Sequence, residues 1–79
     1  DTIINTGVVI DHDCSIGMNC HLAPGVVCSG NVSIGDNTFI GAGSSIIHNI
    51  SIGISSTIAA GSSVFKDVPD HVTIIQSKD

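Results

Sequence analysis

Apolar side chains recur at every sixth position of the chain from Ile4 to Val64. The residues at this position are Ile4, Ile10, Ile16, Leu22, Cys28, Ile34, Ile40, Ile46, Ile52, Ile58 and Val64. Four places further along each unit the residue is small or β-branched, as at Val8 and Ser44. Three places along it is usually Gly, Asn or Asp, which readily adopt the left-handed backbone conformation of tight turns. Each unit therefore predicts a short strand followed by a turn.

This period of six predicts a parallel β-helix. An α-helix would scatter the apolar positions around its surface, because its period is about 3.6 residues. Three units close one triangular coil, and successive coils stack at the strand spacing of about 4.8 Å. The chain is then an all-β domain of about four coils over residues 1–69. The phase fails at Asp70, where an aliphatic residue is due, so residues 70–79 are expected to form a C-terminal tail or a covering strand.

Residues 18 positions apart stack above one another in such a helix. One corner column then consists of His12, Gly30, His48 and Lys66. Gly30 lies directly above His12 in this column and leaves no side chain there. A second column is unusually small and consists of Thr6, Pro24, Ala42 and Ala60. A small column lets a long, thin ligand lie along the prism, or lets a neighbouring prism come close.

Charge and composition exclude several classes of function. The formal net charge is −5, and Lys66 and Lys78 are the only fixed cations, which argues against nucleic acid as a partner. No apolar run approaches the roughly 20 residues of a membrane span, and no signal peptide is visible. Three cysteines without a CxxC pair indicate a reduced, cytoplasmic setting.

The first coil has no cap in this sequence, which starts directly in repeat-like residues at Asp1. Repeat domains need caps, because an uncovered end exposes sheet edges and apolar side chains. We therefore expect an additional N-terminal domain or a partner at this end, and a parent protein longer than the chain.

Five segments carry a more specific signal than the repeat itself. They are NTG at 5–7, VIDHDC at 9–14, HLAPG at 21–25, SGNVSIG at 29–35 and FIGAG at 39–43. Together they resemble bacterial hexapeptide-repeat sugar acetyltransferases, above all the sialic-acid O-acetyltransferases and the N-acetyltransferases of nucleotide-linked amino sugars. The resemblance covers residues 1 to about 70. Many acyltransferases share the repeat, so the His-Asp pair and the later His are what make the resemblance specific to this family.

This resemblance implies transfer of an acetyl group from acetyl-CoA to a hydroxyl or amine of a sugar. His12 would be the general base, and Asp13 the neighbouring acid that raises its basicity. His21, Ala42 and Ala60 would contact acetyl-CoA. The resemblance also implies a left-handed coil and a homotrimer with acetyl-CoA between neighbouring prisms. In the nucleotide-sugar members a separate N-terminal domain binds the sugar, and that domain would be missing from this chain.

These residue types suit that chemistry. An attacking hydroxyl or amine must lose a proton, and His is the side chain best suited to accept one near neutral pH. A carboxylate beside His12, such as Asp13, can hold its tautomer and stabilise the imidazolium. The backbone N–H of Gly30 is a candidate donor to the oxyanion, because no side chain blocks the approach above His12. No His or Cys set has the spacing of a structural zinc site, so no metal is predicted.

Each of these residues also has a simpler interpretation. His12 could be an ordinary exposed corner residue, Asp13 a turn residue, and Gly30 a backbone requirement. His21 lies at a surface position, and His48 and Lys66 are expected to be solvated. The three cysteines, Cys14, Cys20 and Cys28, occupy inward positions and are expected to act as small buried hydrophobes.

Two other functions stay open at this point. The chain could transfer an acyl group to another small acceptor, such as an amino acid or an antibiotic. It could instead be a structural or binding trimer without chemistry. The sequence defines neither the acceptor nor whether oxygen or nitrogen attacks the thioester.

Overall fold

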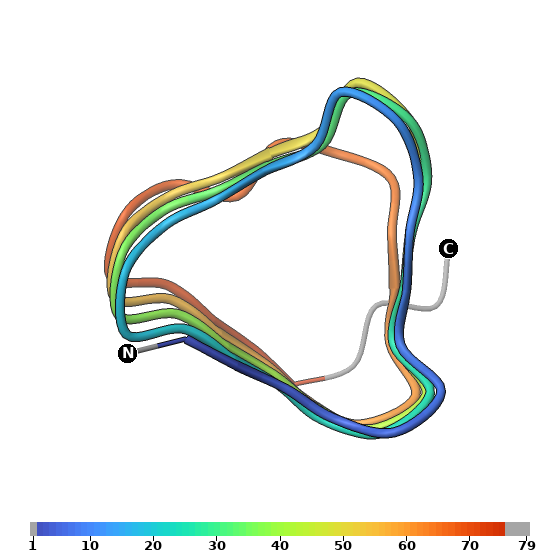
Figure 1. Cartoon of the computed structure of the whole chain (residues 1–79). Coiled ribbons are helices and arrows are strands. Elements are labelled where there is room, and N and C mark those ends of the chain that lie inside the picture. Colours follow the sequence, from blue (N-terminus) through green and yellow to red (C-terminus); the bar gives the residue numbers. More distant parts are fainter. Residues whose placement is uncertain (1, 76–79) are drawn as a thin grey trace.

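The chain winds into a triangular coil of two-residue parallel strands, and the structure, a computed structural model, describes residues 2–75 (Figure 1). The strands form three sheets, one on each face of the prism. The first sheet contains β1 (Ile3–Ile4), β4 (His21–Leu22), β7 (Phe39–Ile40), β10 (Thr57–Ile58) and β12 (Thr73–Ile74). The second contains β2 (Val9–Ile10), β5 (Val27–Cys28), β8 (Ser45–Ile46) and β11 (Ser63–Val64). The third contains β3 (Ser15–Ile16), β6 (Ser33–Ile34) and β9 (Ser51–Ile52). The expected parallel β-helix of about four coils is confirmed.

Three corners join these sheets. The His12 corner leads from the second sheet to the third and contains residues 11–14, 29–32, 47–50 and 65–67. The small corner leads from the first sheet to the second and contains residues 5–8, 23–26, 41–44 and 59–62. The third corner contains residues 17–20, 35–38, 53–56 and 69–72. Seen down the axis, the His12 corner lies across the triangle from the first sheet (Figure 1).

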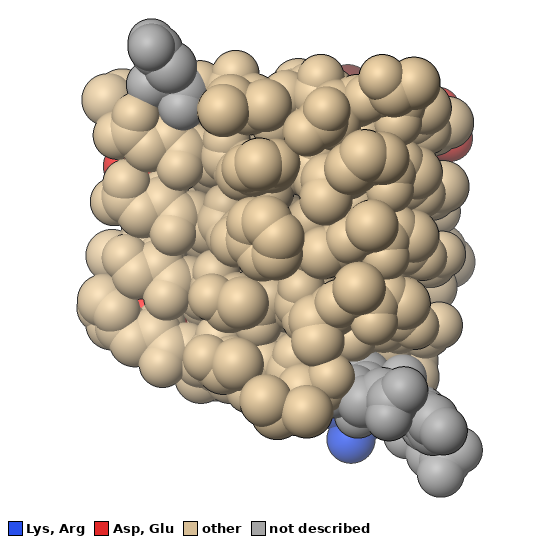
Figure 2. Space-filling model, turned by 90° about the horizontal axis from the view of Figure 1, so that it is seen from below, with Lys and Arg blue, Asp and Glu red and all other residues tan. Residues whose placement is uncertain are grey.

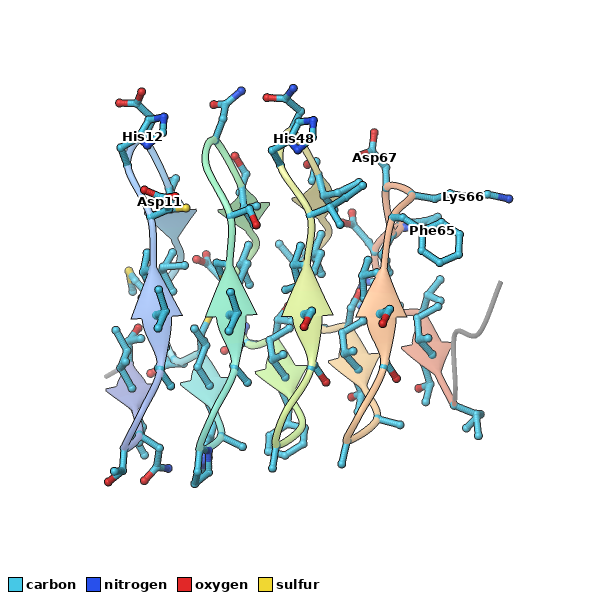
Figure 3. The ribbon with its side chains drawn as sticks, turned by 90° about the vertical axis from the view of Figure 1, so that its right-hand side faces the viewer. Asp11, His12, His48, Phe65, Lys66 and Asp67 are labelled. Atoms are coloured by element: carbon cyan, nitrogen blue, oxygen red, sulfur yellow. The ribbon has the colours of Figure 1, made fainter. Side chains whose placement is uncertain are left out.

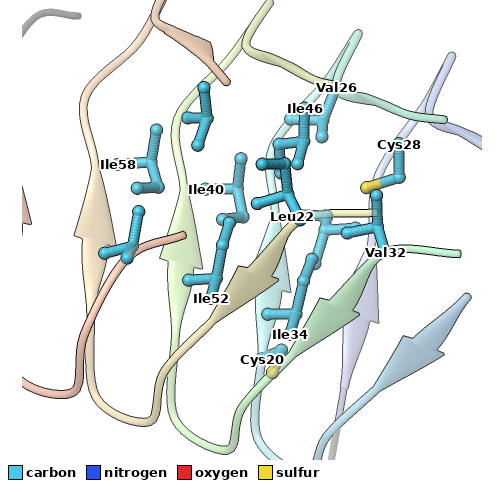
Figure 4. Close-up of a cluster of buried hydrophobic side chains, with 13 residues drawn as sticks. Cys20, Leu22, Val26, Cys28, Val32, Ile34, Ile40, Ile46, Ile52 and Ile58 are labelled. Atoms are coloured by element: carbon cyan, nitrogen blue, oxygen red, sulfur yellow. The ribbon is translucent and has the colours of Figure 1, made fainter. Parts of the chain in front are cut away.

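The core is a narrow column of aliphatic side chains from the sixth-residue positions (Figure 4). Leu22, Ile40 and Ile58 stack along the first sheet and are fully buried. At the first coil the same inward position is open, because no other coil of residues 2–75 covers it, and Ile4 is 51% exposed. Burying such side chains supplies the main favourable term in folding, about 25 cal/mol per Å² of apolar surface.

Small polar residues complete the core because each finds a carbonyl acceptor, which lies in the next coil for Thr38, Ser44 and Ser56 and in the same coil for Ser62. The Thr38 hydroxyl donates to the Gly53 carbonyl oxygen at 2.8 Å, and the Ser44 hydroxyl donates to the Ala59 carbonyl oxygen at 3.0 Å. Both partners lie 15 residues further along the chain. A buried hydroxyl left without a partner would be costly, so this position accepts only side chains that reach the carbonyl or have no polar atom.

The turn position of the repeat has the left-handed backbone that its residue types predict. Its members with positive φ are Gly7, Asp13, Asn19, Gly25, Asn31, Asn37, Gly43, Asn49, Ser55 and Gly61. Residues other than Gly, Asn and Asp pay a steric cost in this region, which is why these three types dominate the position.

The fourth coil is two residues shorter than the others at the His12 corner. Three residues, 65–67, join Val64 to Val68, whereas five residues, 47–51, join the stacked residues Ile46 and Ile52. Val68 therefore pairs with Ile52, which lies 16 residues before it. The trace of the fourth coil visibly cuts inside this corner (Figure 1).

The repeat resumes after this shortening, with its phase moved by two. The Ser56 hydroxyl donates to the Pro69 carbonyl oxygen 13 residues on, and His71 has the positive φ of a turn residue. Strand β12 then adds to the first sheet, with Thr73 beside Thr57. The expected loss of phase at Asp70 is thus a shift that occurs at 65–67. Residues 76–79 of the expected tail, with Lys78, lie outside the described residues.

Candidate active site

His12 lies at the turn between β2 and β3, with its imidazole against the backbone of Gly30 in the next coil. A Cβ atom built on Gly30 would lie 3.0 Å from Cε1 and 3.1 Å from Nε2 of His12. Gly30 is not among the glycines with positive φ, so its backbone conformation does not require glycine. The space taken by the imidazole therefore explains glycine here better than a backbone requirement does.

Asp11 holds the imidazole of His12 in place (Figure 3). Its Oδ1 atom accepts a hydrogen bond from the backbone N–H of His12 at 2.7 Å and lies 2.9 Å from Nδ1 of the ring. The hydrogen bonds from the His12 side chain and backbone lower the pKa of Asp11 below its ordinary value. The two side chains stay open to solvent, with 75% of His12 and 58% of Asp11 exposed. The pair is thus a histidine with a fixed ring that a ligand can still reach.

The carboxylate bonded to His12 is Asp11, whereas the sequence analysis expected Asp13. Asp13 has φ of 59° and occupies the turn position of the repeat. Among the described residues it makes no hydrogen bond or ion pair with His12. Its left-handed backbone serves the turn, whereas the side chain of Asp11 accepts the backbone N–H of the residue that follows it.

The Gly30 amide next to the ring has a free donor. Its carbonyl accepts a hydrogen bond from the backbone N–H of Asn49, while its own N–H donates to no group among the described residues. The same coil step is tied by a bond of 2.8 Å between the side chains of Asn31 and Asn49. A backbone N–H without an acceptor close to a candidate base is one donor that an oxyanion can use.

His21 belongs to β4 of the first sheet, and this sheet lies across the triangle from the His12 corner (Figure 1). Its Nε2 atom is 3.2 Å from Nδ2 of Asn5, and its ring packs edge-on against Phe39 with centroids 5.2 Å apart. This face shows no charged side chain over most of its area, as Figure 2 illustrates. A single copy of the chain therefore does not bring His12 and His21 to one ligand.

The small column also lies away from His12, at the small corner. Pro24, Ala42 and Ala60 are exposed there. Cβ atoms built on the neighbouring turn residues Gly43 and Gly61 would meet nothing within 4 Å, so the surface beside the column is open. The column is smooth enough for a close approach, but within one chain it does not face the candidate base.

The column that begins at His12 continues to His48 but does not include Lys66, which the sequence analysis expected at its end. His48 lies at the equivalent turn two coils on and is exposed. Lys66 does not continue the stack, because residues 65–67 form the shortened corner, and its side chain extends along the axis away from His48 (Figure 3). The shortening removes the two residues that an 18-residue coil would place there.

The cysteines are part of the core. The Cys14 thiol donates to the Ser29 carbonyl oxygen and the Cys20 thiol to the Gly35 carbonyl oxygen, both at 3.1 Å. Burial raises the pKa of the Cys28 thiol to about 11, with a smaller contribution from Cys14. A buried thiol that holds its proton is a poor nucleophile.

Two further classes of site are not observed. Within residues 2–75, no group of three or more His, Cys, Asp or Glu side chains is placed to hold a metal ion. The described residues also contain no helix that is long and apolar enough to cross a membrane.

Two contributors, Asp11 and Asn5, were missed by the sequence analysis. Both occupy the position directly after the sixth-residue aliphatic, and Gly or Ala is frequent at this position. Both also contact a histidine. Asp11 is the only charged residue at this position in the units from Ile4 to Val64. That departure from the repeat was a usable signal.

Comparison with known proteins supports the resemblance that the sequence indicates. The hexapeptide repeat of succinyl-transferase matches residues 31–66. No curated protein sequence matches the chain.

Solved structures match the fold closely. A histidine-to-asparagine mutant of perosamine N-acetyltransferase from Caulobacter crescentus, in complex with CoA and GDP-perosamine, has a TM-score of 0.90 and 43% identity over 91% of this chain and 34% of that chain. The acetyltransferase domain of PglB from Neisseria gonorrhoeae, in complex with acetyl coenzyme A, has a TM-score of 0.90 and 36% identity over 91% and 35%. Serine acetyltransferase of the same organism, in complex with serine, has a TM-score of 0.75 and 32% identity over 91% and 36%.

These matches confirm the resemblance to hexapeptide-repeat sugar acetyltransferases. The chain spans about a third of the length of the matched proteins.

Proposed function

We propose that this chain is the acetyl-CoA-binding, catalytic part of an acetyltransferase that modifies an amine or hydroxyl of a nucleotide-linked or free sugar, with His12 as the general base. The observation that carries the proposal is the ring of His12, held by Asp11 and lying against the bare backbone of Gly30. The scaffold that presents it matches a perosamine N-acetyltransferase bound to CoA and GDP-perosamine.

The proposed reaction is a direct transfer. The acceptor amine or hydroxyl attacks the thioester carbonyl carbon of acetyl-CoA while Nε2 of His12 takes its proton. The free N–H of Gly30 is the candidate donor to the oxyanion that forms on the carbonyl oxygen. The carbon–sulfur bond then breaks, and the CoA thiolate recovers the proton from the imidazolium. The net change moves one acetyl group and leaves the histidine neutral.

The complete site needs a second copy of the chain. His21, Ala42 and Ala60, the residues proposed to contact acetyl-CoA, lie on the first sheet and the small corner, away from the His12 corner. A ligand can meet both sets only if the His12 corner of one copy faces the first sheet or small corner of another. The uncharged outer face of the first sheet, with Phe39 40% exposed, suits such a contact. We therefore propose a homotrimer with acetyl-CoA between neighbouring prisms.

The acceptor is proposed from the same comparison. A sugar is favoured because the match to perosamine N-acetyltransferase has a TM-score of 0.90, against 0.75 for serine acetyltransferase. The match to serine acetyltransferase keeps an amino-acid acceptor as the second candidate. Residues outside this chain, including the expected N-terminal sugar-binding domain, would supply the contacts that choose between them. Three free cysteines fit the proposed cytoplasmic, reducing setting.

Binding and assembly test this proposal without a known acceptor. We expect sedimentation of the chain to give a trimer, and titration calorimetry with acetyl-CoA to give saturable binding. Ala42→Leu and Ala60→Leu should weaken binding by at least about tenfold, because each fills the small column. Ser33→Leu, at an outward position of the third sheet, is the matched control and should bind normally.

Two results would contradict the proposal. One is an assembled trimer that shows no saturable binding of acetyl-CoA. The other is equal loss of binding in Ala42→Leu and Ser33→Leu, which would place the ligand away from the small column. The rates at which the full-length protein acetylates GDP-perosamine and serine then distinguish the two acceptor classes.

A further inference from the structure

We propose that Asp11 is the carboxylate that positions the His12 imidazole for proton transfer, and that Asp13 serves the turn. The inference rests on the proposed function, because it concerns how His12 acts as the base. It differs from the assignment that the family resemblance suggests. Its basis is the pair of hydrogen bonds that converge on one oxygen of Asp11.

The geometry of this pair defines the tautomer of His12. An ionised carboxylate only accepts hydrogen bonds, so the 2.9 Å contact between Oδ1 of Asp11 and Nδ1 of His12 requires the proton on Nδ1. The lone pair is then on Nε2, one of the two ring atoms that lie nearest to the Cα of Gly30 on its side-chain side. The nitrogen able to accept a proton therefore lies beside the Gly30 backbone, on a side chain that is 75% exposed.

The backbone makes this arrangement rigid. The same Oδ1 atom also accepts the N–H of His12 at 2.7 Å, which holds the carboxylate beside the ring whatever the charge of the imidazole. An exposed Asp is ionised at neutral pH, and the hydrogen bonds from His12 lower the pKa of Asp11 further. During transfer the proton of the acceptor goes to Nε2 and later leaves from Nε2, while Asp11 keeps the Nδ1–H bond and takes no proton.

Position in the repeat separates the two aspartates. Asp13 shares its positive φ with Asn19, Asn31 and Asn49 at the same turn position, so the turn alone accounts for its residue type. Asp11 occupies a position that is Gly or Ala in most other units, and the repeat gives no reason for a carboxylate there. The contact with His12 is the only structural reason for Asp11 among the described residues.

Histidine tautomers measured by NMR test this inference independently of activity. Two-bond ¹H–¹⁵N correlation spectra of the labelled chain, at a pH where imidazole is neutral, distinguish Nδ1–H from Nε2–H rings. We expect His12 to be predominantly Nδ1–H, and Asp11→Ala to convert it mainly to Nε2–H. Asp11→Asn should retain much of the wild-type tautomer, because the amide oxygen can still accept both hydrogen bonds. Asp13→Asn, which suits the left-handed turn, should leave the His12 tautomer unchanged.

Kinetics in the full-length protein give the second measurement. Asp11→Ala should lower kcat by at least about tenfold with little change in KM for acetyl-CoA, because the ring is misplaced while the ligand surface stays intact. Asp11→Asn should recover part of this loss, and Asp13→Asn should stay within about twofold of wild type.

The outcomes separate this inference from the proposed function. If Asp11→Ala leaves the His12 tautomer unchanged, or if Asp13→Asn changes it as much, the assignment to Asp11 is wrong. If the tautomer responds to Asp11→Ala but the full-length protein transfers no acetyl group to any acceptor, the positioning stands and the catalytic proposal fails. Loss of folding in Asp11→Ala would appear in the whole spectrum, and Asp11→Gly, which places the residue found at this position in several other units, then takes its place.

Discussion

His12 and His48 occupy the same turn of the repeat two coils apart, yet their surroundings differ. The backbone N–H groups of Asp11 and Ile47, the residues before them, bond equivalent carbonyls, Cys28 O at 2.9 Å and Val64 O at 3.1 Å. Before His12 stands a carboxylate that bonds its ring, whereas the residue before His48 is Ile47. The local backbone is thus nearly the same, and the neighbouring side chains make the difference.

The coils above the two histidines differ as well. Gly30 lies over the imidazole of His12 and offers a free N–H. The corner above His48 is the shortened one, 65–67, whose Lys66 extends along the axis (Figure 3). A histidine on this scaffold becomes a candidate base through a carboxylate beside it and bare backbone above it, and only His12 has both among the described residues.

The largest effect is expected from removing each histidine in turn. His12→Ala should lower kcat/KM for acetyl transfer roughly 100- to 10,000-fold, the usual contribution of general base catalysis. His48→Ala should stay within about threefold, because nothing in its surroundings prepares it for proton transfer. Steady-state release of CoA thiol by the full-length protein measures both variants. Comparable losses in the two variants would remove the distinction between the histidines.

A smaller effect is expected from placing a methyl group above His12. Gly30→Ala should lower kcat/KM by about tenfold, because its Cβ would press on Cε1 and Nε2 and turn the ring. The variant should remain folded, since the φ of Gly30 is not positive and a side chain adds no backbone strain. Thermal unfolding checks that point.

A double-mutant cycle identifies the cause of the Gly30→Ala effect. If the methyl group acts by turning the imidazole, Gly30→Ala should have almost no further effect in the His12→Ala background. An equal loss in both backgrounds would show that the methyl group blocks the ligand or the free N–H instead, and that the ring is not the element that Gly30 accommodates.

The fold could be predicted from the sequence because each unit of the repeat carries its own complete pattern. The residue that faces inward, the turn residue and the small position are all local, so the period of six alone predicts the stacked coils. The sequence analysis missed the two-residue shortening at 65–67, because it kept a single phase from Ile4 to Val64 and expected the next aliphatic residue at position 70. Residues Val68, Val72 and Ile74 already show the shifted phase, and Pro69 as the hydrogen-bond partner of Ser56 confirms it.

The candidate site was only partly predictable. The stacking of Gly30 on His12 follows from the 18-residue spacing, which the structure reproduces. Sequence adjacency could not choose between Asp11 and Asp13, because both flank His12 and only the folded structure shows that Asp11 reaches Nδ1 of the ring. Contact between His12 and the face that carries His21 depends on how copies assemble, and one chain's sequence does not describe that arrangement.

The smallest effect is expected from giving His48 the carboxylate neighbour that His12 has. Ile47→Asp places a carboxylate before His48 on a backbone bonded like that of Asp11. Because Ile47 is only 40% exposed, the substitution also removes buried apolar surface and should lower the free energy of unfolding by about 1–3 kcal/mol. We expect the neutral ring of His48 to shift toward the Nδ1–H tautomer in the same NMR experiment, with Ile47→Asn as the uncharged control. An unchanged His48 tautomer would show that a preceding carboxylate is insufficient, and that Gly30 above His12 is needed to hold the ring where Asp11 can bond it.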